Sequence, residues 1–120
     1  MRIAVTSSGT DLDAQVDPRF GRCANFIFVD TETDECEVVP NENVAAGGGA
    51  GVQSAQLVTD KGAAVVLTGN CGPNAYRTLE AAGVNLIVGV SGTVREAVEK
   101  YKAGGFESTE GPNVDAKFGV

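Results

Sequence analysis

Residues 63–73 have the sequence AAVVLTGNCGP, and they decide the fold of this chain. The apolar run 63–68 predicts a buried strand, and residues 73–82 predict a helix that ends at Gly83. Pro73 suits the first position of that helix, because an N–H would have no partner there. A buried strand that leads directly into a helix predicts a right-handed crossover to a parallel neighbouring strand.

The segments on either side extend this unit into an α/β fold. Adjacent apolar residues Ile3, Ala4 and Val5 predict a first strand that is buried on both faces and therefore central. The strands before residue 63 are connected by loops and can pair as an antiparallel meander, whereas the later strands must be parallel. The predicted elements are strands at 2–7, 25–30, 35–39, 63–68 and 85–90, and helices at 52–61, 73–82 and from Thr93 onward, where a capping box begins.

The composition limits the classes of function. The 120 residues suffice for one domain, which we place at residues 1–105 and which is followed by a polar, partly mobile tail at 106–120. A formal net charge of −7 argues against a nucleic-acid partner. No apolar run is long enough to cross a membrane, and the chain enters its first strand without a signal-peptide pattern. We therefore expect a cytoplasmic protein with no membrane contact.

The chain has no histidine and three cysteines. The missing histidine excludes a Ser-His-Asp or Cys-His catalytic apparatus and removes the commonest zinc ligand. An odd number of widely spaced cysteines favours free thiols over a disulfide framework. We expect that the protein is not an enzyme.

Several loops should meet at the carboxyl ends of parallel strands, which is where open α/β sheets bind their ligands. These loops are 8–22, 40–51, 69–72 and 89–92. Cys71 would lie just ahead of a helix N-terminus, an environment that favours the thiolate and hence metal binding. The alternative for Cys71 is a buried thiol in a turn.

The loop before Cys23 carries two arginines in an acidic half of the chain. Arg19 and Arg22 offer forked donors to an anion, or they pair with nearby carboxylates. Phe20 either covers an apolar face of a ligand or fills the core, and Cys23 is either a ligand or a small buried residue. The glycine run 47–51 precedes a helix, so its N–H groups either hold an anion or form a flexible linker.

Four motifs recur together in one known family. They are DPRFGR at 17–22, AGVQSA at 50–55, TGNCGPNA at 68–75 and GTVREAV at 92–98. With these motifs the chain, from Met1 to about Gly105, resembles the dinitrogenase iron-molybdenum cofactor biosynthesis family. The resemblance implies a ribonuclease-H-like, three-layer α/β fold with a five-stranded mixed sheet of order 3-2-1-4-5 and flanking helices, without ribonuclease activity.

The resemblance also implies a function, namely that of a carrier or scaffold for an anionic metal–sulfur cluster. Nitrogenase-linked members often have a histidine before the Phe-Gly-Arg motif, where this chain has Arg19. The cluster would be of the Fe–S, Mo–Fe–S or Mo–Cu–S type, and the partners would be cluster-assembly or acceptor proteins. The alternative function is a regulatory module that binds a phosphate-bearing small molecule at the same loops.

The predicted site combines the loops expected at the strand ends with the residues that the family resemblance implies. Soft-metal ligands would be Cys71 and Cys23. Charge, apolar cover and backbone donors would come from Arg19, Phe20, Gly21, Arg22, Gly48, Gly49, Gly51, Gly69, Asn70, Gly72 and Asn74.

Overall fold

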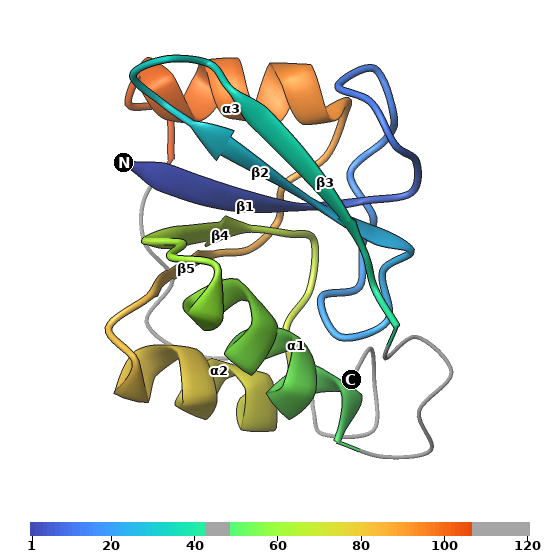
Figure 1. The fold of residues 1–120 in the computed structure, drawn as a ribbon, viewed down its shortest axis with the longest axis vertical. Helices are drawn as coiled ribbons and strands as arrows, with labels where there is room; N and C mark the ends of the chain where they lie inside the picture. The colour runs from blue at the N-terminus through green and yellow to red at the C-terminus, as the bar shows by residue number, and fades with distance from the viewer. Residues whose placement is uncertain (43–48, 107–120) are drawn as a thin grey trace.

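A five-stranded mixed sheet carries helices on both faces (Figure 1). The computed structural model describes residues 1–42 and 49–106, so the predicted contact Gly48 and the predicted tail beyond residue 106 lie outside the described residues. In chain order the elements are β1 (Arg2–Ser7), β2 (Asn25–Asp30), β3 (Cys36–Pro40), α1 (Ala50–Asp60), β4 (Val65–Leu67), α2 (Pro73–Ala81), β5 (Asn85–Ile87) and α3 (Val94–Lys102).

The strand order is β3-β2-β1-β4-β5, which confirms the predicted order and the central place of β1. β1 pairs antiparallel with β2, and β2 pairs antiparallel with β3, whereas the β1–β4 and β4–β5 pairs are parallel. β3 therefore runs in the same direction as β1. Consequently β1, β3, β4 and β5 all have their carboxyl ends at one edge of the sheet.

Alternate residues of β1 pack into two hydrophobic cores, one on each face of the sheet. Ala4 lies in the core shared with Phe26, Phe28 and the apolar faces of α1 and α2. Ile3 and Val5 lie in the other core, which α3 covers (Figure 1). This division follows from the two-residue repeat of a strand, and burial on both faces explains why β1 is apolar without alternation.

The helix ends agree with local sequence signals. α1 begins at Ala50, two residues earlier than predicted, because Gly49 adopts a left-handed φ of 74° and turns the chain into the helix. At α3 the predicted capping box is confirmed: Thr93 Oγ1 accepts from the Glu96 N–H at 3.1 Å, and Glu96 Oε1 accepts from the Thr93 N–H at 2.9 Å. Among the described helices, none has the length and apolar character that a membrane span requires.

β4 and β5 are shorter than predicted, with three residues each. The Ala63 N–H donates to Val58 O at 3.1 Å, so residue 63 belongs to the turn after α1. β5 ends early because the chain turns at Gly89, where φ is 75°. Short strands at this side of the sheet bring the loops after β4 and β5 close to the loop after β1.

Candidate functional site

Loop 17–22, which follows β1, lies directly against the turn 69–72, which follows β4. The Phe20 N–H donates to Asn70 O at 3.1 Å, and Arg19 pairs with Asn70 in a short parallel bridge. Figure 1 shows the loop after β1 and the turn after β4 at the same end of the sheet. The predicted meeting of these two segments is therefore confirmed.

Two glycines allow these backbones to approach one another. A Cβ on Gly69 would lie 2.7 Å from the Cα of Pro18, and a Cβ on Gly21 would lie 2.9 Å from the Cα of Gly51 at the start of α1. Real Cβ atoms do not make backbone contacts this short, so a larger residue at either position would push the segments apart. Gly21 and Gly69 thus fix loop 17–22 between the turn 69–72 and α1.

Hydrogen bonds between buried polar groups fix the conformation of loop 17–22. Asp17 is 6% exposed, and its carboxylate accepts from the Arg19 N–H at 3.0 Å and from the Ala24 N–H at 3.4 Å. The hydroxyl of Thr6, at the end of β1, donates to Asp17 O at 2.8 Å. Because buried polar groups are costly without partners, these bonds favour one conformation of the loop.

Asn41, one residue beyond β3, ties a second loop to the first. Its Nδ2 donates to Gly21 O at 3.1 Å and to Cys23 O at 2.9 Å, and the Ser54 hydroxyl of α1 donates to the same Gly21 oxygen at 3.3 Å. The sequence prediction missed Asn41 and Ser54. Of the two, only Ser54 could have been noticed in the sequence, because a polar residue on the apolar face of a predicted helix indicates a buried hydrogen bond.

The two predicted arginines lie on this braced loop. The Arg19 side chain is 50% exposed, and its Nε lies 3.8 Å from Asp17 Oδ1. Arg22 is partly buried three residues further along. Arg19 thus presents its guanidinium to solvent beside the turn 69–72, while its backbone is fixed by Asp17.

A further arginine, which the sequence prediction missed, lies on α2. Arg77 Nη2 donates to Asn74 Oδ1 at 3.0 Å, and Arg77 Nε donates to Pro73 O at 3.3 Å. Asn74, a predicted contact, is exposed, and its side-chain oxygen already accepts this hydrogen bond from Arg77. The spacing of three and four residues from Asn74 and Pro73 was the signal in the sequence that could have placed Arg77 here.

The N-terminal ends of α1 and α2 differ from that of α3. Their N-cap residues are Gly49 and Gly72, neither of which supplies a side-chain acceptor, and neither helix has an acidic residue in its first turn. α3 has both, in Thr93 and Glu96. The first N–H groups of a helix have no acceptor within it and carry a partial positive charge, so α1 and α2 present a positive end without an internal counter-charge.

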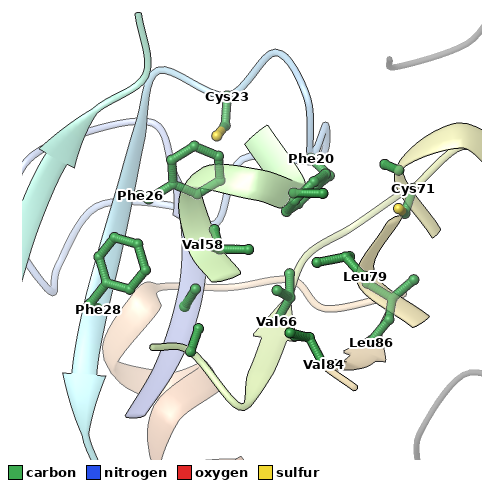
Figure 2. Close-up of a cluster of buried hydrophobic side chains, with 14 residues drawn as sticks. Phe20, Cys23, Phe26, Phe28, Val58, Val66, Cys71, Leu79, Val84 and Leu86 are labelled. Carbon is green, nitrogen blue, oxygen red and sulfur yellow. The ribbon is translucent and has the colours of Figure 1, made fainter. Parts of the chain in front are cut away.

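The cysteines Cys71 and Cys23 are buried, and the structure does not give them the environment that the sequence predicted for Cys71. Cys71 and Cys23 are both 0% exposed and belong to the core beneath α1 and α2, where Figure 2 shows them on either side of Phe20 in that view. Burial raises the pKa of the Cys71 thiol to about 12, and burial followed by the nearby Asp17 carboxylate raises the pKa of Cys23. The predicted thiolate environment at Cys71 is therefore wrong, because its side chain is buried in the core, where its Sγ donates to Gly72 O at 3.6 Å.

Phe20 also lies in the core. It is 0% exposed and makes an edge-to-face contact with Phe26, with ring centroids 5.8 Å apart (Figure 2). Its predicted role as an apolar cover for a ligand is thus wrong, and the alternative that it fills the core is confirmed. The phenyl ring instead anchors loop 17–22 from below.

Side chains suited to hard or borderline metals do not converge in the described part of the chain. Within residues 1–42 and 49–106, no group of three or more Cys, Asp or Glu side chains is placed to hold a metal ion. Ligation by Cys71 or Cys23 remains a prediction, and it would require a buried, protonated thiol to become exposed and ionised. The positive features at this end of the sheet suit an anion better than a bare cation.

The model of the dinitrogenase iron-molybdenum cofactor family matches residues 1–104. The chain belongs to this family. It is similar to the orange protein of Desulfovibrio gigas, whose apo structure shares 43% sequence identity and a TM-score of 0.92 over 94% of this chain and 96% of that one. It is also similar to a NifB-like protein from Thermotoga, at 39% identity and a TM-score of 0.78 over 89% and 91% of the two chains.

An uncharacterized protein of Methanocaldococcus jannaschii is 30% identical over 101 residues, which cover 80% of this chain and 84% of that protein. The relatives therefore match the chain over most of their own length. The family assignment and the mixed sheet agree with the resemblance found in the sequence motifs.

Proposed function

We propose that this protein carries or scaffolds an anionic metal–sulfur cluster at the end of the sheet formed by loop 17–22, the turn 69–72 and the N-terminal ends of α1 and α2. This surface is called the cargo edge below. Membership of the cofactor family and the likeness to the orange protein support a cluster as the cargo. The protein itself would perform no catalysis and would exchange the cargo with cluster-assembly or acceptor proteins.

The observation that carries the proposal is the sign of the charge at the cargo edge. The whole chain has a formal net charge of −7, yet this edge carries Arg19 and Arg22 against one buried carboxylate, Asp17, together with two helix N-termini without acidic residues in their first turns. An acidic protein repels an anionic cargo everywhere except where positive groups are concentrated. Guanidinium groups and backbone N–H groups are the donors that bind sulfide-rich or oxygen-rich anions through charge-assisted hydrogen bonds.

The cargo would be held mainly by charge and hydrogen bonds and not by thiolate ligands. Cys71 and Cys23 are buried as protonated thiols, so a metal would have to displace a proton and disturb the core to reach either sulfur. Non-covalent binding of this kind permits loading and release without ligand exchange at the protein. Such reversibility suits a carrier.

The test is anaerobic loading with copper(I) and tetrathiomolybdate, or with iron, sulfide and molybdate, followed by visible absorption of the desalted protein. The double variant Arg19→Ala/Arg22→Ala should bind the coloured species about 30-fold more weakly, at about 1 kcal/mol for each charge removed. The loss should grow smaller as salt is raised, because salt screens exposed charges.

The control is Lys100→Ala/Lys102→Ala, which removes the same charge from the last turn of α3. It should retain the affinity of the unaltered protein. Equal affinity in the arginine double variant would refute the assignment of the cargo edge. Thermal stabilisation by nucleotides, with none by the cluster components, would instead support the alternative of a module that binds a phosphate-bearing small molecule.

A further inference from the structure

Arg77 places a positive charge where helix electrostatics disfavours one. Arg77 is the middle residue of α2, but its guanidinium folds back onto Pro73 O, at 3.3 Å, and Asn74 Oδ1, at 3.0 Å, in the first turn. A helical side chain normally lies over the turn that precedes it, so this direction is favoured by the backbone. The N-terminal end of a helix is already positive, and a cation there is destabilising in the absence of an anion.

Arg95 is also a cation in the first turn of a helix, α3, but it forms an ion pair with Asp13 at 3.2 Å. α3 has Glu96 in its first turn and Lys100 and Lys102 in its last, the arrangement that complements the helix dipole. Lys102 also forms an ion pair with Asp34 at 2.6 Å. Within residues 1–42 and 49–106, no carboxylate forms an ion pair with Arg77.

The chain connects Arg77 to the cargo edge over a short distance. Arg19 is bridged to Asn70, and Pro73, whose oxygen Arg77 contacts, is only three residues further along. Three residues span at most about 11 Å even when fully extended. Arg19, on loop 17–22, is therefore bridged to a residue of the turn 69–72, and Arg77, on α2, contacts the first residue after that turn.

We infer that Arg77 is a third cationic contact for the anionic cargo, supplied by α2, and that the site selects an anion large enough to reach from loop 17–22 to α2. This inference rests on the proposed function of the cargo edge. A compact anion such as molybdate would contact either loop 17–22 or α2, whereas a polynuclear metal–sulfide anion would contact both. Arg77 would thus contribute to selection by size as well as by charge.

The test compares Arg77→Gln with Lys102→Gln, which removes one positive charge from the far end of α3. Each protein is titrated anaerobically with copper(I) and tetrathiomolybdate, followed by visible absorption, and separately with molybdate, followed by calorimetry. Arg77→Gln should bind the copper–tetrathiomolybdate species about three- to five-fold more weakly, while Lys102→Gln should bind it like the unaltered protein. Arg77→Lys, which keeps the charge but loses the planar fork, should recover part of the loss.

The outcomes separate this inference from the proposed function. A loss in Arg19→Ala/Arg22→Ala together with unchanged affinity in Arg77→Gln would overturn the role of Arg77 and leave the cargo edge in place. An equal loss in Arg77→Gln and Lys102→Gln would overturn it as well, since the effect would then follow net charge alone. An equal loss of molybdate and cluster affinity in Arg77→Gln would overturn the selection by size. Arg77 is exposed, so the variants should unfold at the temperature of the unaltered protein, which circular dichroism checks.

Discussion

The close approach of Gly69 to Pro18 makes the substitution Gly69→Ala a direct probe of the cargo edge. The new Cβ would lie 2.7 Å from the Pro18 Cα and 2.9 Å from its carbonyl oxygen, so the two backbones would have to separate by about 0.7 Å to reach ordinary contact. Neither neighbour is a flexible side chain, and the strain should cost about 1–3 kcal/mol. For a chain of 120 residues this corresponds to a fall in Tm of about 4–12 °C.

The same displacement moves loop 17–22 away from the turn 69–72, so cargo affinity should fall about five- to ten-fold. Gly83→Ala is the matched control. Gly83 has a φ of 76° and no atom within 4 Å of the new Cβ, so this variant should lose about 1 kcal/mol of stability through backbone strain and bind cargo normally. Thermal unfolding by circular dichroism and anaerobic titration give the two readouts. If Gly69→Ala matches the unaltered protein in both Tm and affinity, the two backbones do not approach as described.

Three further predictions concern the core, the thiols and α3. Phe20→Ala should lower the free energy of unfolding by about 3–5 kcal/mol, measured in urea, because the ring is fully buried; a loss below 1 kcal/mol would contradict its place in the core. Burial raises the pKa of Cys71 from 9.0 to about 12, so the thiol ionises first in the unfolded chain. The contribution of Cys71 to stability should be constant from neutral pH to about pH 9 and fall by about 1.4 kcal/mol per pH unit above it, with a similar fall from the buried Cys23, and a flat profile from pH 9 to pH 11 would argue against burial. Thr93→Ala should lower stability by about 1 kcal/mol through loss of the capping box and leave cargo affinity unchanged, whereas weaker cargo binding would extend the site to α3.

The sheet could be predicted because its signals are local and consistent with one another. Adjacent apolar residues identified the central strand β1, and the strand–Pro73–helix sequence required a parallel crossover. The capping box at Thr93 located the start of α3 to the residue. These features specify topology, and topology alone brings the loops after β1 and β4 to one edge of the sheet.

The direction of individual side chains at the cargo edge could not be predicted. Cys71 was expected to face the N–H groups of α2, but the turn 69–72 packs against loop 17–22 and directs the sulfur into the core. Phe20 is drawn inward by the same packing. Both outcomes depend on contacts between segments about fifty residues apart in sequence, and no local pattern encodes them.

The buried hydrogen bonds that hold loop 17–22 in place could not be predicted either. Asn41 follows an exposed strand and precedes a glycine-rich loop, so its sequence context suggests a surface residue, yet it is 3% exposed and donates to two backbone oxygens of the neighbouring loop. Arg77, by contrast, is an exposed residue of α2, and its spacing from Pro73 and Asn74 indicates a contact within the helix but not a role at the cargo edge. Its significance comes only from its contacts with the first turn of α2, which place its charge beside the helix N-terminus.

The central claim is that an anionic cluster binds at the cargo edge, and amide chemical-shift mapping tests it most directly. A ¹⁵N-labelled sample would be titrated anaerobically with copper(I) and tetrathiomolybdate, which form a diamagnetic species. The largest shifts should fall within residues 17–22 and 69–77 and at Gly49 and Ala50, with the Arg19 and Arg77 guanidinium signals among them. Shifts concentrated in α3 or in the β2–β3 hairpin, with residues 17–22 and 69–77 unchanged, would contradict the account.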